Sequence, residues 1–548
     1  MGKKRRESVA NVSIQTTLSY SEVEEEPNGN RTFPYGLVRA VRHYLEFIGL
    51  LKFLRSLKRE TCSAPRLDLI VVALIVFTLY DTNSMDACSR WLEDPQIKKI
   101  LGFRRTDNIS QITIDRAVKI LGNNRESILE MLWKGITNRF EIDNYEVAVD
   151  GSAVIVYGPK ARMGNLGHPR DGGPSDLQIE FTVAILTQLD IPIYVKPFEG
   201  NASDERQYRE AIPEISGLIQ GKGIRGMEEY KKQALELASV ATMAKVGAMI
   251  IADNGAASSE NVKRAEKCGN DMLTREKLNM SDERNIIEHC CDFEVLPDLG
   301  VMCYMHTFDS SGRTNYLYCS PDLLQASVKK GCKSIERGLR DYRYLQEHGM
   351  NRSKIVKVRK VPGYKVDLSI SRDEDFDPKE FTEARILKDA RRNAGIRTGF
   401  FKLSCTVQLT PEEALRRYRQ RALVEQTISS LKRITGIKPL RVWGDEAVGG
   451  SMVLALLGEA VLSMARYCSK KRFKNVDKRS GKKQLSYVAS TRTLASELRH
   501  LTLTRFCHIG KRFDAVLSNW TPFTEDVFAG IHEHESPEWG SKKVPLIT

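Results

Sequence analysis

The sequence predicts an α/β protein: a mixed β-sheet with flanking helices, preceded by a helical region and interrupted by a β-rich insertion. Three observations lead to this prediction. Apolar residues recur at helical spacing through residues 36–144. From residue 145 the pattern changes to short apolar or alternating runs, which are typical of strands. Helical patterns then separate later strands, the order expected for a sheet covered by helices.

Length, charge and cysteine content indicate what kind of protein this is. The chain has 548 residues, enough for about three domains. Its formal net charge of +14 favours a polyanionic partner, of which nucleic acid is the commonest. Eleven cysteines occur without a CxxC pair, which predicts reduced thiols and a cytoplasmic location. The histidines and cysteines between 289 and 306 lack a standard zinc spacing.

The first 144 residues divide into a tail and a helical domain. Residues 1–35 are polar, with KKRR followed by EVEEE, and we expect a disordered tail. Helical patterns then cover 44–57, 67–80, 85–92 and 112–133, with breaks at Asp94-Pro95 and at 104–108. The run from Leu69 to Tyr80 is too short to cross a bilayer, so no membrane partner is expected.

This helical domain, residues 36–144, carries arginines that suit DNA. They are Arg104, Arg105, Arg116 and Arg125. A helix-turn-helix is one interpretation, although no spacing requires it. A helical domain that serves only packing is the alternative.

Two predicted strands end on an acidic residue. They are EVAVD, ending at Asp150, and AMIIAD, ending at Asp253. Two further strands, 178–187 and 191–195, form a hairpin through the turn at 188–190. If the two acid-bearing strands are neighbours, both carboxylates emerge at one edge of the sheet.

Beyond residue 269 the predicted elements change character. Residues 270–403 contain several β-like runs and form the predicted insertion; the runs are 301–308, 315–319, 355–358, 364–370 and 399–404. An apolar helix over 450–467 reads as core. Residues 466–483 hold nine lysines and arginines against one aspartate, which favours phosphate contact. The tail from about Pro522 is expected to be irregular.

One helix, opened by Pro411, carries the most specific pattern. Tyr418, Arg421, Glu425 and Lys432 fall within an arc of roughly 60° at about 100° per residue. The opposite arc holds Leu423, Thr427, Leu431 and Ile434, a mostly apolar core stripe. An ordinary amphipathic helix with surface ion pairs is the alternative interpretation.

Asp150, Asp253 and Glu425 together form a candidate metal site. Three carboxylates without Cys or His suit a hard cation, Mg²⁺ or Mn²⁺. Two such ions activate a water or a 3′-hydroxyl for attack on a phosphodiester. Arg421 and Lys432 suit phosphate, and Tyr418 suits a phosphate or a base.

These motifs resemble an insertion-sequence transposase family of bacteria and archaea. Residues 418–432 match its signature Tyr-x2-Arg-x3-Glu-x6-Lys at every spacing. Asp150-Gly-Ser152 is similar to its first-aspartate motif, with Ser in place of the usual Thr. Residues 200–204 (GNASD), 250–255 (IIADNG) and 273–275 (LTR) resemble further motifs, in the family's order.

The resemblance implies an RNase H-like catalytic domain, here 145–269 and 404–465, with the insertion 270–403 before the catalytic Glu and a basic C-terminal region, 466–548. It implies a catalytic triad of Asp150, Asp253 and Glu425 holding two Mg²⁺ or Mn²⁺ ions. It also implies cleavage at the ends of an insertion sequence and joining of 3′-hydroxyls to target DNA. Tyr418, Arg421 and Lys432 would bind the element's end.

The family context implies further partners and alternatives. Double-stranded DNA, a homodimer on paired inverted repeats and a cytoplasmic, nucleoid-associated location in a prokaryote are expected. Two other functions stay open on the sequence. One is a domesticated relative that only binds DNA, and the other is an RNase H-like nuclease that cuts without joining.

Overall fold

The computed structural model describes residues 31–57, 65–81, 84–157, 161–167, 176–227, 248–307, 312–327, 397–442, 444–480, 490–507 and 513–535, together with 329, 340, 343 and 347. The chain forms two compact units, one of Met1–Asp271 with Gln420–Thr548 and one of Met272–Arg419. Residues 228–246, whose apolar pattern is helical, and the predicted strands at 355–358 and 364–370 lie outside the described residues.

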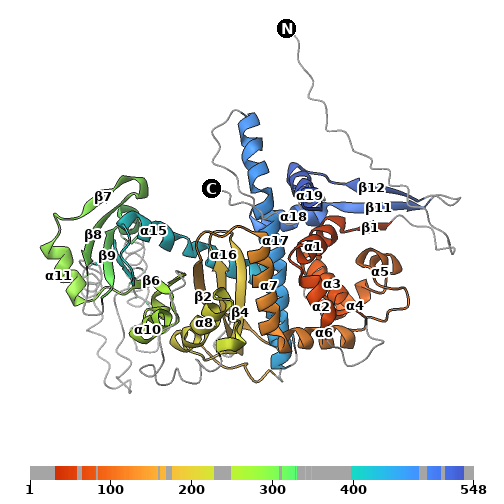
Figure 1. Ribbon diagram of the computed structural model, residues 1–548, viewed down its shortest axis with the longest axis horizontal. Coiled ribbons are helices and arrows are strands. Elements are labelled where there is room, and N and C mark those ends of the chain that lie inside the picture. The colour runs from red at the N-terminus through yellow and green to blue at the C-terminus, as the bar shows by residue number, and fades with distance from the viewer. Residues whose placement is uncertain are drawn as a thin grey trace, which may run out of the picture. The chain divides into compact units, whose positions relative to one another are not determined.

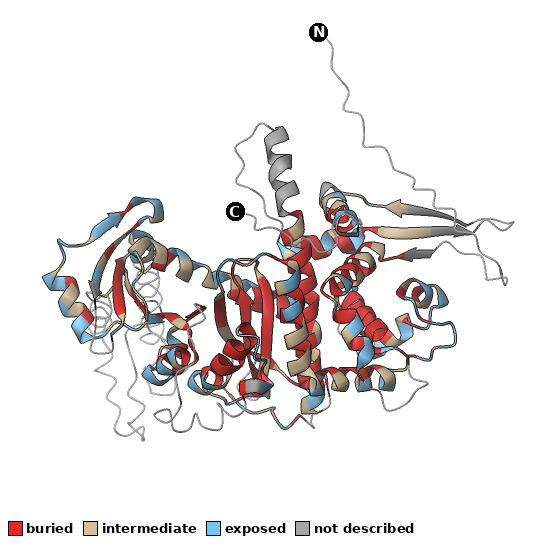
Figure 2. Cartoon of the chain, in the orientation of Figure 1, coloured by how far each residue is buried: buried red, intermediate tan, exposed pale blue. Residues whose placement is uncertain are grey.

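A short strand and a group of helices open the first unit. They are β1 (Arg31–Phe33), α1 (Tyr35–Phe47), α2 (Leu50–Ser56), α3 (Leu67–Tyr80), α4 (Met85–Trp91), α5 (Pro95–Leu101), α6 (Gln111–Asn123) and α7 (Arg125–Arg139). Helix α3 has the predicted bounds and is almost wholly buried (Figure 2). The helix predicted over 44–57 is two helices, because Gly49 between them has φ 76°.

Two predictions for the ends of the chain were wrong, and a predicted break between helices is present. Residues 31–33 of the predicted tail form β1, because Phe33 is buried and the strand pairs with β11. The predicted break at Asp94-Pro95 separates α4 from α5, where the Asp94 side chain accepts from the Gln96 N–H and Pro95 occupies the first turn of α5. The tail from Pro522 forms α19 (Pro522–Glu535), which buries Val527 and Ile531.

The predicted mixed α/β fold is confirmed in the first unit. Its central strands are β2 (Glu146–Ile155), β3 (Gln178–Leu186), β4 (Ile191–Glu199) and β5 (Met249–Ala252), in the order β4-β3-β2-β5. The first three are antiparallel, and β5 runs parallel to β2. The predicted β3–β4 turn is present, with Asp190 at φ 55°.

Helices cover both the sheet and each other in this unit (Figure 1). They are α8 (Asp204–Ile219), α10 (Ser259–Lys267), α16 (Arg421–Arg433), α17 (Asp445–Ser480) and α18 (Thr491–His500). Helix α16 contacts β2 and β3, and α17 contacts β4, α6 and α16. Helix α17 runs unbroken across the boundary predicted at residue 465. Near the C-terminus, β11 (Thr502–Cys507) lies between β1 and β12 (Phe513–Ser518).

One stretch of α17 is long and apolar enough to span a membrane. Within Asp445–Ser469, a stretch of 18 residues has a mean hydropathy of 1.7, and 89% of that stretch is buried inside the protein. The bent pair α3 and α4 passes the same test only if both are taken as one span. Burial among other helices is what a core helix shows, as the apolar pattern at 450–467 predicts.

The described residues of the second unit form an antiparallel sheet with helices, among them α11 and α15. Its elements are β6 (Asp271–Glu276), α11 (Met280–Glu288), β7 (Glu294–Leu296), β8 (Val301–Thr307), β9 (Thr314–Cys319), β10 (Phe400–Cys405) and α15 (Pro411–Arg419). The strand order is β6-β10-β9-β8-β7. The hydroxyl of Tyr318 donates to the Pro411 carbonyl at 2.7 Å, which ties the start of α15 to β9. The predicted strands at 301–308, 315–319 and 399–404 are confirmed.

Candidate active site

One guanidinium lies among the three predicted carboxylates. Arg421 Nη2 is 3.0 Å from Asp150 Oδ2 and 3.5 Å from Asp253 Oδ2. Arg421 Nη1 is 2.7 Å from Glu425 Oε1. These side chains come from β2, from the residue after β5 and from α16, so the fold brings together residues that are 275 positions apart in the chain (425 − 150).

The register of β2 and β5 explains why the two aspartates meet. The strands are parallel, with Val147 opposite Ile250 and Ala148 opposite Ile251. Continuing that register by two residues places Asp150 opposite Asp253. In a parallel pair, residues that face each other point to the same side of the sheet. The register of β2 and β5 therefore brings Asp253, the residue that follows β5, next to Asp150.

The expectation that Asp150 ends its strand was wrong. Strand β2 continues to Ile155, because its second half pairs with β3 up to Gln178. The residue after Asp150 is Gly151, where a Cβ would lie 3.0 Å from Gln207 Oε1. Asp150 is therefore a mid-strand residue, held on a rigid element rather than in a turn.

In each aspartate, one carboxylate oxygen accepts a hydrogen bond from a backbone N–H and the other faces Arg421. Asp150 Oδ1 accepts from the Gly151 N–H at 2.9 Å. Asp253 Oδ1 accepts from the Gly255 N–H at 2.9 Å, and the Tyr208 hydroxyl donates to the same oxygen at 3.5 Å. Both carboxylates are therefore oriented before any ligand binds.

Burial sets the electrostatics of the site. It raises the pKa of Asp150 to about 6, against the opposing charge of Arg421 and with a further increase from Asp253. Exposure of the carboxylate side chains increases from 16% for Asp150 to 37% for Asp253 and 55% for Glu425. The site thus runs from a desolvated inner carboxylate to one open to solvent.

The single helix predicted from Pro411 through Lys432 is two helices. Helix α15 ends at Arg419 and α16 begins at Arg421, and the Leu423 N–H bonds to the Gln420 carbonyl three residues back rather than four. Tyr418 lies on α15 and Arg421 on α16, so the predicted set of four residues is divided between two helices.

The predicted faces of α16 are partly correct. Thr427 and Leu431 are buried as expected, whereas Leu423 and Ile434 are half-buried. Val424 and Ile428 complete the packed side. Lys432 is half-buried on α16, seven residues beyond Glu425. The periodicity of the whole stretch did not reveal that the helix is interrupted at Gln420.

The predicted basic segment gives a mixed result. Arg466 is 15% exposed and forms an ion pair with Asp190, so it does not face solvent as a phosphate ligand. Burial lowers the pKa of Arg466. The backbone is helical to Ser480, while the side chains of 470–480 and all of 481–489 lie outside the described part of the chain.

Helix α8 supplies supporting residues that sequence reasoning missed. Gln207 is buried against Gly151 and accepts from the Thr182 hydroxyl at 3.0 Å. Tyr208 lies between the Val149 carbonyl and Asp253. The GNASD motif just before these residues was the available signal. Its Ser203 caps α8, accepting from the Arg206 N–H at 3.3 Å.

The donor set fits a hard cation in its chemistry. Asp150, Asp253 and Glu425 offer only carboxylate oxygens, the ligands that Mg²⁺ and Mn²⁺ prefer. Within the described residues, however, no three His, Cys, Asp or Glu side chains are placed to hold a metal ion. The Arg421 guanidinium takes the central position instead. A divalent ion would therefore compete with Arg421 for the same oxygens.

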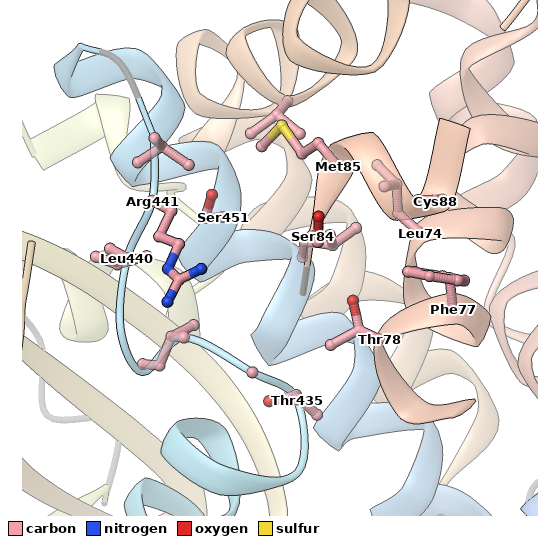
Figure 3. A pocket seen from close by; sticks show the side chains of 15 residues that line it. Leu74, Phe77, Thr78, Ser84, Met85, Cys88, Thr435, Leu440, Arg441 and Ser451 are labelled. Carbon is pink, nitrogen blue, oxygen red and sulfur yellow. The ribbon is translucent and has the colours of Figure 1, made fainter. Parts of the chain in front are cut away.

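A small pocket lies away from these carboxylates (Figure 3). It is lined mainly by apolar side chains of α3, α4 and α17 and by the loop after α16, including Leu74, Phe77, Met85 and Leu440. Arg441 extends into this view from the loop. None of the predicted site residues lines the pocket, so it is separate from the carboxylate site.

Comparison with known proteins gives limited information on the whole chain. No curated protein matches it. A solved structure described as the piggyBac transposase synaptic complex with hairpin DNA is similar over 92% of this chain and 81% of that chain, with 9% identity and a TM-score of 0.36. A TM-score this low does not establish a shared fold.

A family model gives the more specific match. It is described as a transposase DDE domain, and it matches residues 228–457. That range contains Asp253, Arg421 and Glu425, whereas Asp150 precedes it. Within the first unit, two of the three clustered carboxylates thus belong to a segment similar to a transposase DDE domain.

Proposed function

We propose that this protein is a DNA transposase that cleaves the ends of an insertion sequence and joins the 3′-hydroxyls to target DNA. The observation that carries the proposal is the convergence of Asp150, Asp253 and Glu425 on one guanidinium. Three carboxylates from three separate elements repel one another unless a cation lies between them. Such an arrangement is useful for catalysis if a metal ion can replace the Arg421 guanidinium between the carboxylates.

The topology of the first unit supports an RNase H-like catalytic domain. Three antiparallel strands are followed by a strand parallel to the first, with Asp150 on that first strand. The match of residues 228–457 to a transposase DDE domain agrees with this proposal. A homodimer on paired inverted repeats and an action at the prokaryotic nucleoid remain part of the proposal.

Asp150, Asp253 and Glu425 would hold one or two Mg²⁺ or Mn²⁺ ions. When bound, such ions activate a water or a 3′-hydroxyl and stabilise the leaving oxygen of a phosphodiester. The protein's own contribution is orientation, because the Gly151 and Gly255 amides fix one oxygen of each aspartate. Arg421 would leave the carboxylates and become free to bind phosphate with Lys432 and Tyr418.

The test is end cleavage by the full chain. Duplexes carrying the inverted repeats that flank the gene are incubated with the protein and Mg²⁺, and products are resolved on a denaturing gel. We expect cleavage by the wild type, none by Glu425→Gln, and wild-type activity in the control Glu260→Gln, an exposed glutamate of α10. Cleavage unchanged in Glu425→Gln would falsify the assignment.

A second readout separates the remaining functions. Joining of the cleaved ends to a target plasmid identifies a transposase. Cleavage without joining identifies a nuclease, and DNA binding without cleavage identifies a domesticated binder.

A further inference from the structure

Helix α6 has one packed side and one open side. Ile114, Ala117, Val118 and Leu121 are buried. At about 100° per residue the opposite arc holds Ile112, Arg116 and Asn123, all exposed, with Ile112 64% exposed. Asp115 and Lys119 on the same side form an ion pair at 2.7 Å. The open side of α6 therefore carries one exposed apolar and one exposed cationic side chain, Ile112 and Arg116.

The packed side of α6 holds the helix rigidly. A Cβ on Gly122 would lie 1.8 Å from the Glu446 carbonyl oxygen, and a Cβ on Gly450 would lie 1.9 Å from the Val118 carbonyl oxygen. The two glycines therefore let α6 and α17 cross in backbone contact. Helix α17 also contacts β4 and α16. The open side of α6 is thus presented by a helix that is fixed to the catalytic sheet.

The surroundings of the open side are positively charged. Residues 95–124 contain six lysines and arginines against two aspartates. Arg104 and Arg105, in the loop before α6, are exposed. Arg125, which the sequence also offered to DNA, is instead bound to Glu214 at 3.1 Å and is 11% exposed. Of the four arginines that the sequence offered to DNA, Arg104, Arg105 and Arg116 are exposed and lie on α6 or in the loop before it.

We infer that α6 lies in the major groove of double-stranded DNA and reads its bases through Ile112 and Arg116. This rests on the proposed transposase function and names the element that recognises the DNA ends. The guanidinium of Arg116 matches the O6 and N7 acceptors of guanine, and the Ile112 side chain matches the methyl group of thymine. Arg104 and Arg105 contact the phosphates and set the register without reading sequence.

The charge and shape of this surface favour DNA over a protein partner. The helix has 13 residues, about 20 Å, and an α-helix fits the roughly 12 Å width of the major groove. Its cations complement the phosphates that border the groove. Because the open side combines one apolar and one forked cationic side chain, it suits base edges, which present methyl groups and paired acceptors.

The test selects binding sites from a pool of duplexes with a random 20-base-pair core. The full chain is used as wild type, Arg116→Gln, Ile112→Ala and the control Arg225→Gln, which removes an exposed arginine of another element. We expect the wild type and the control to enrich one sequence. Arg116→Gln should lose its preference at one or two positions and bind the selected duplex about 10- to 100-fold less tightly.

Three outcomes overturn the inference. One is that both α6 variants enrich the wild-type sequence with wild-type affinity. Another is that the wild type enriches none, since a reading helix requires a preference. A third is that Arg225→Gln loses as much specificity as Arg116→Gln. Circular dichroism and a melting curve show whether each variant is folded.

The assay is independent of the proposed chemistry. A sequence preference that depends on Arg116, in a chain that does not cleave DNA with Mg²⁺, supports the reading helix and removes the transposase proposal. Mg²⁺-dependent end cleavage, with a sequence preference that the α6 variants leave unchanged, supports the transposase proposal and removes the assignment of α6 as the reading helix.

Discussion

Two groups of charged side chains in the first unit differ in how their charge is balanced. Glu214 of α8 is 1% exposed and has three donors: Arg125 at 3.1 Å, Lys196 at 2.7 Å and the Tyr194 hydroxyl at 2.9 Å. Two more carboxylates face the same cations, with Glu126 3.5 Å from Arg125 and Glu210 2.9 Å from Lys196. At the candidate site three carboxylates, Asp150, Asp253 and Glu425, share the one guanidinium of Arg421.

The contrast separates a structural ion pair from a functional site. Around Glu214 every charge is satisfied within the protein, so the cluster joins α7, β4 and α8 and has no need of a ligand. The Arg421 cluster has more negative than positive charge, and it becomes more exposed toward Glu425. A deficit of positive charge in a half-open site attracts a cation, which is what metal-dependent phosphoryl transfer requires.

The largest effect expected is on activity. Asp150→Asn removes a metal ligand while keeping its size, and we expect end cleavage to fall about 10⁴-fold. Because burial penalises the Asp150 charge, the variant should be at least as stable as wild type at pH 8. Cleavage rates and denaturant unfolding measure the two effects. If Asp150→Asn lowers both the stability to denaturant and the cleavage rate, Asp150 is a structural acid like Glu214.

Glu214→Gln should behave in the opposite way. It removes the most buried of the carboxylates that face Arg125 and Lys196, leaving these cations to Glu126 and Glu210, and we expect a loss of about 3 kcal/mol in the free energy of unfolding. Cleavage per folded molecule should stay near that of wild type. Urea titration measures the first quantity and active-site-normalised cleavage the second. An unchanged free energy of unfolding would show that the Glu214 charge does not stabilise the fold through Arg125 and Lys196.

Glu459 of α17 extends the comparison to an acid without a cation among its closest contacts. It is 1% exposed and accepts from the Ser430 hydroxyl, and burial raises its pKa to about 7. A folded-state pKa above the unfolded value means that its stabilising contribution is present below pH 4.5 and is lost as pH rises through about 7.

We therefore expect the wild type to lose stability relative to Glu459→Gln between pH 5 and pH 9, on the order of 3 kcal/mol. The glutamine keeps an acceptor for Ser430 and has no charge to desolvate. Unfolding free energies of the two proteins across this range give the difference, and Glu260→Gln serves as the exposed control. Parallel pH curves for wild type and Glu459→Gln would contradict the prediction.

The smallest effect concerns the competition at the candidate site. Arg421→Gln removes the guanidinium that occupies the carboxylates, so Mn²⁺ should bind the DNA-free protein about tenfold more tightly. Arg433→Gln, an exposed change on the same helix, should leave the affinity unchanged. Isothermal titration at pH 8 measures both. Equal or weaker Mn²⁺ binding in Arg421→Gln would show that the arginine does not compete with metal.

Local pattern predicted some elements well and others poorly. Helix α3 and strands β8 to β10 were found because their apolar runs are long or alternate clearly. The hairpin of β11 and β12 was missed, and α16 was merged with α15. A tertiary contact decided the first case, because β11 pairs with β1, far away in the sequence. The second case depends on a local feature, the hydrogen bond from the Leu423 N–H to the Gln420 carbonyl three residues back, which apolar periodicity does not report.

By itself, the sequence determined which side chains are candidates for chemistry: three carboxylates, one arginine in helical spacing with Glu425, and a basic chain. Local propensity and spacing are enough for that, because they depend on neighbours along the chain. Only the tertiary structure decided that Asp150 is mid-strand, that Tyr418 lies on another helix than Arg421, and that Arg125 is half-buried against Glu214. Those outcomes depend on strand register and on burial, which arise between residues far apart in sequence.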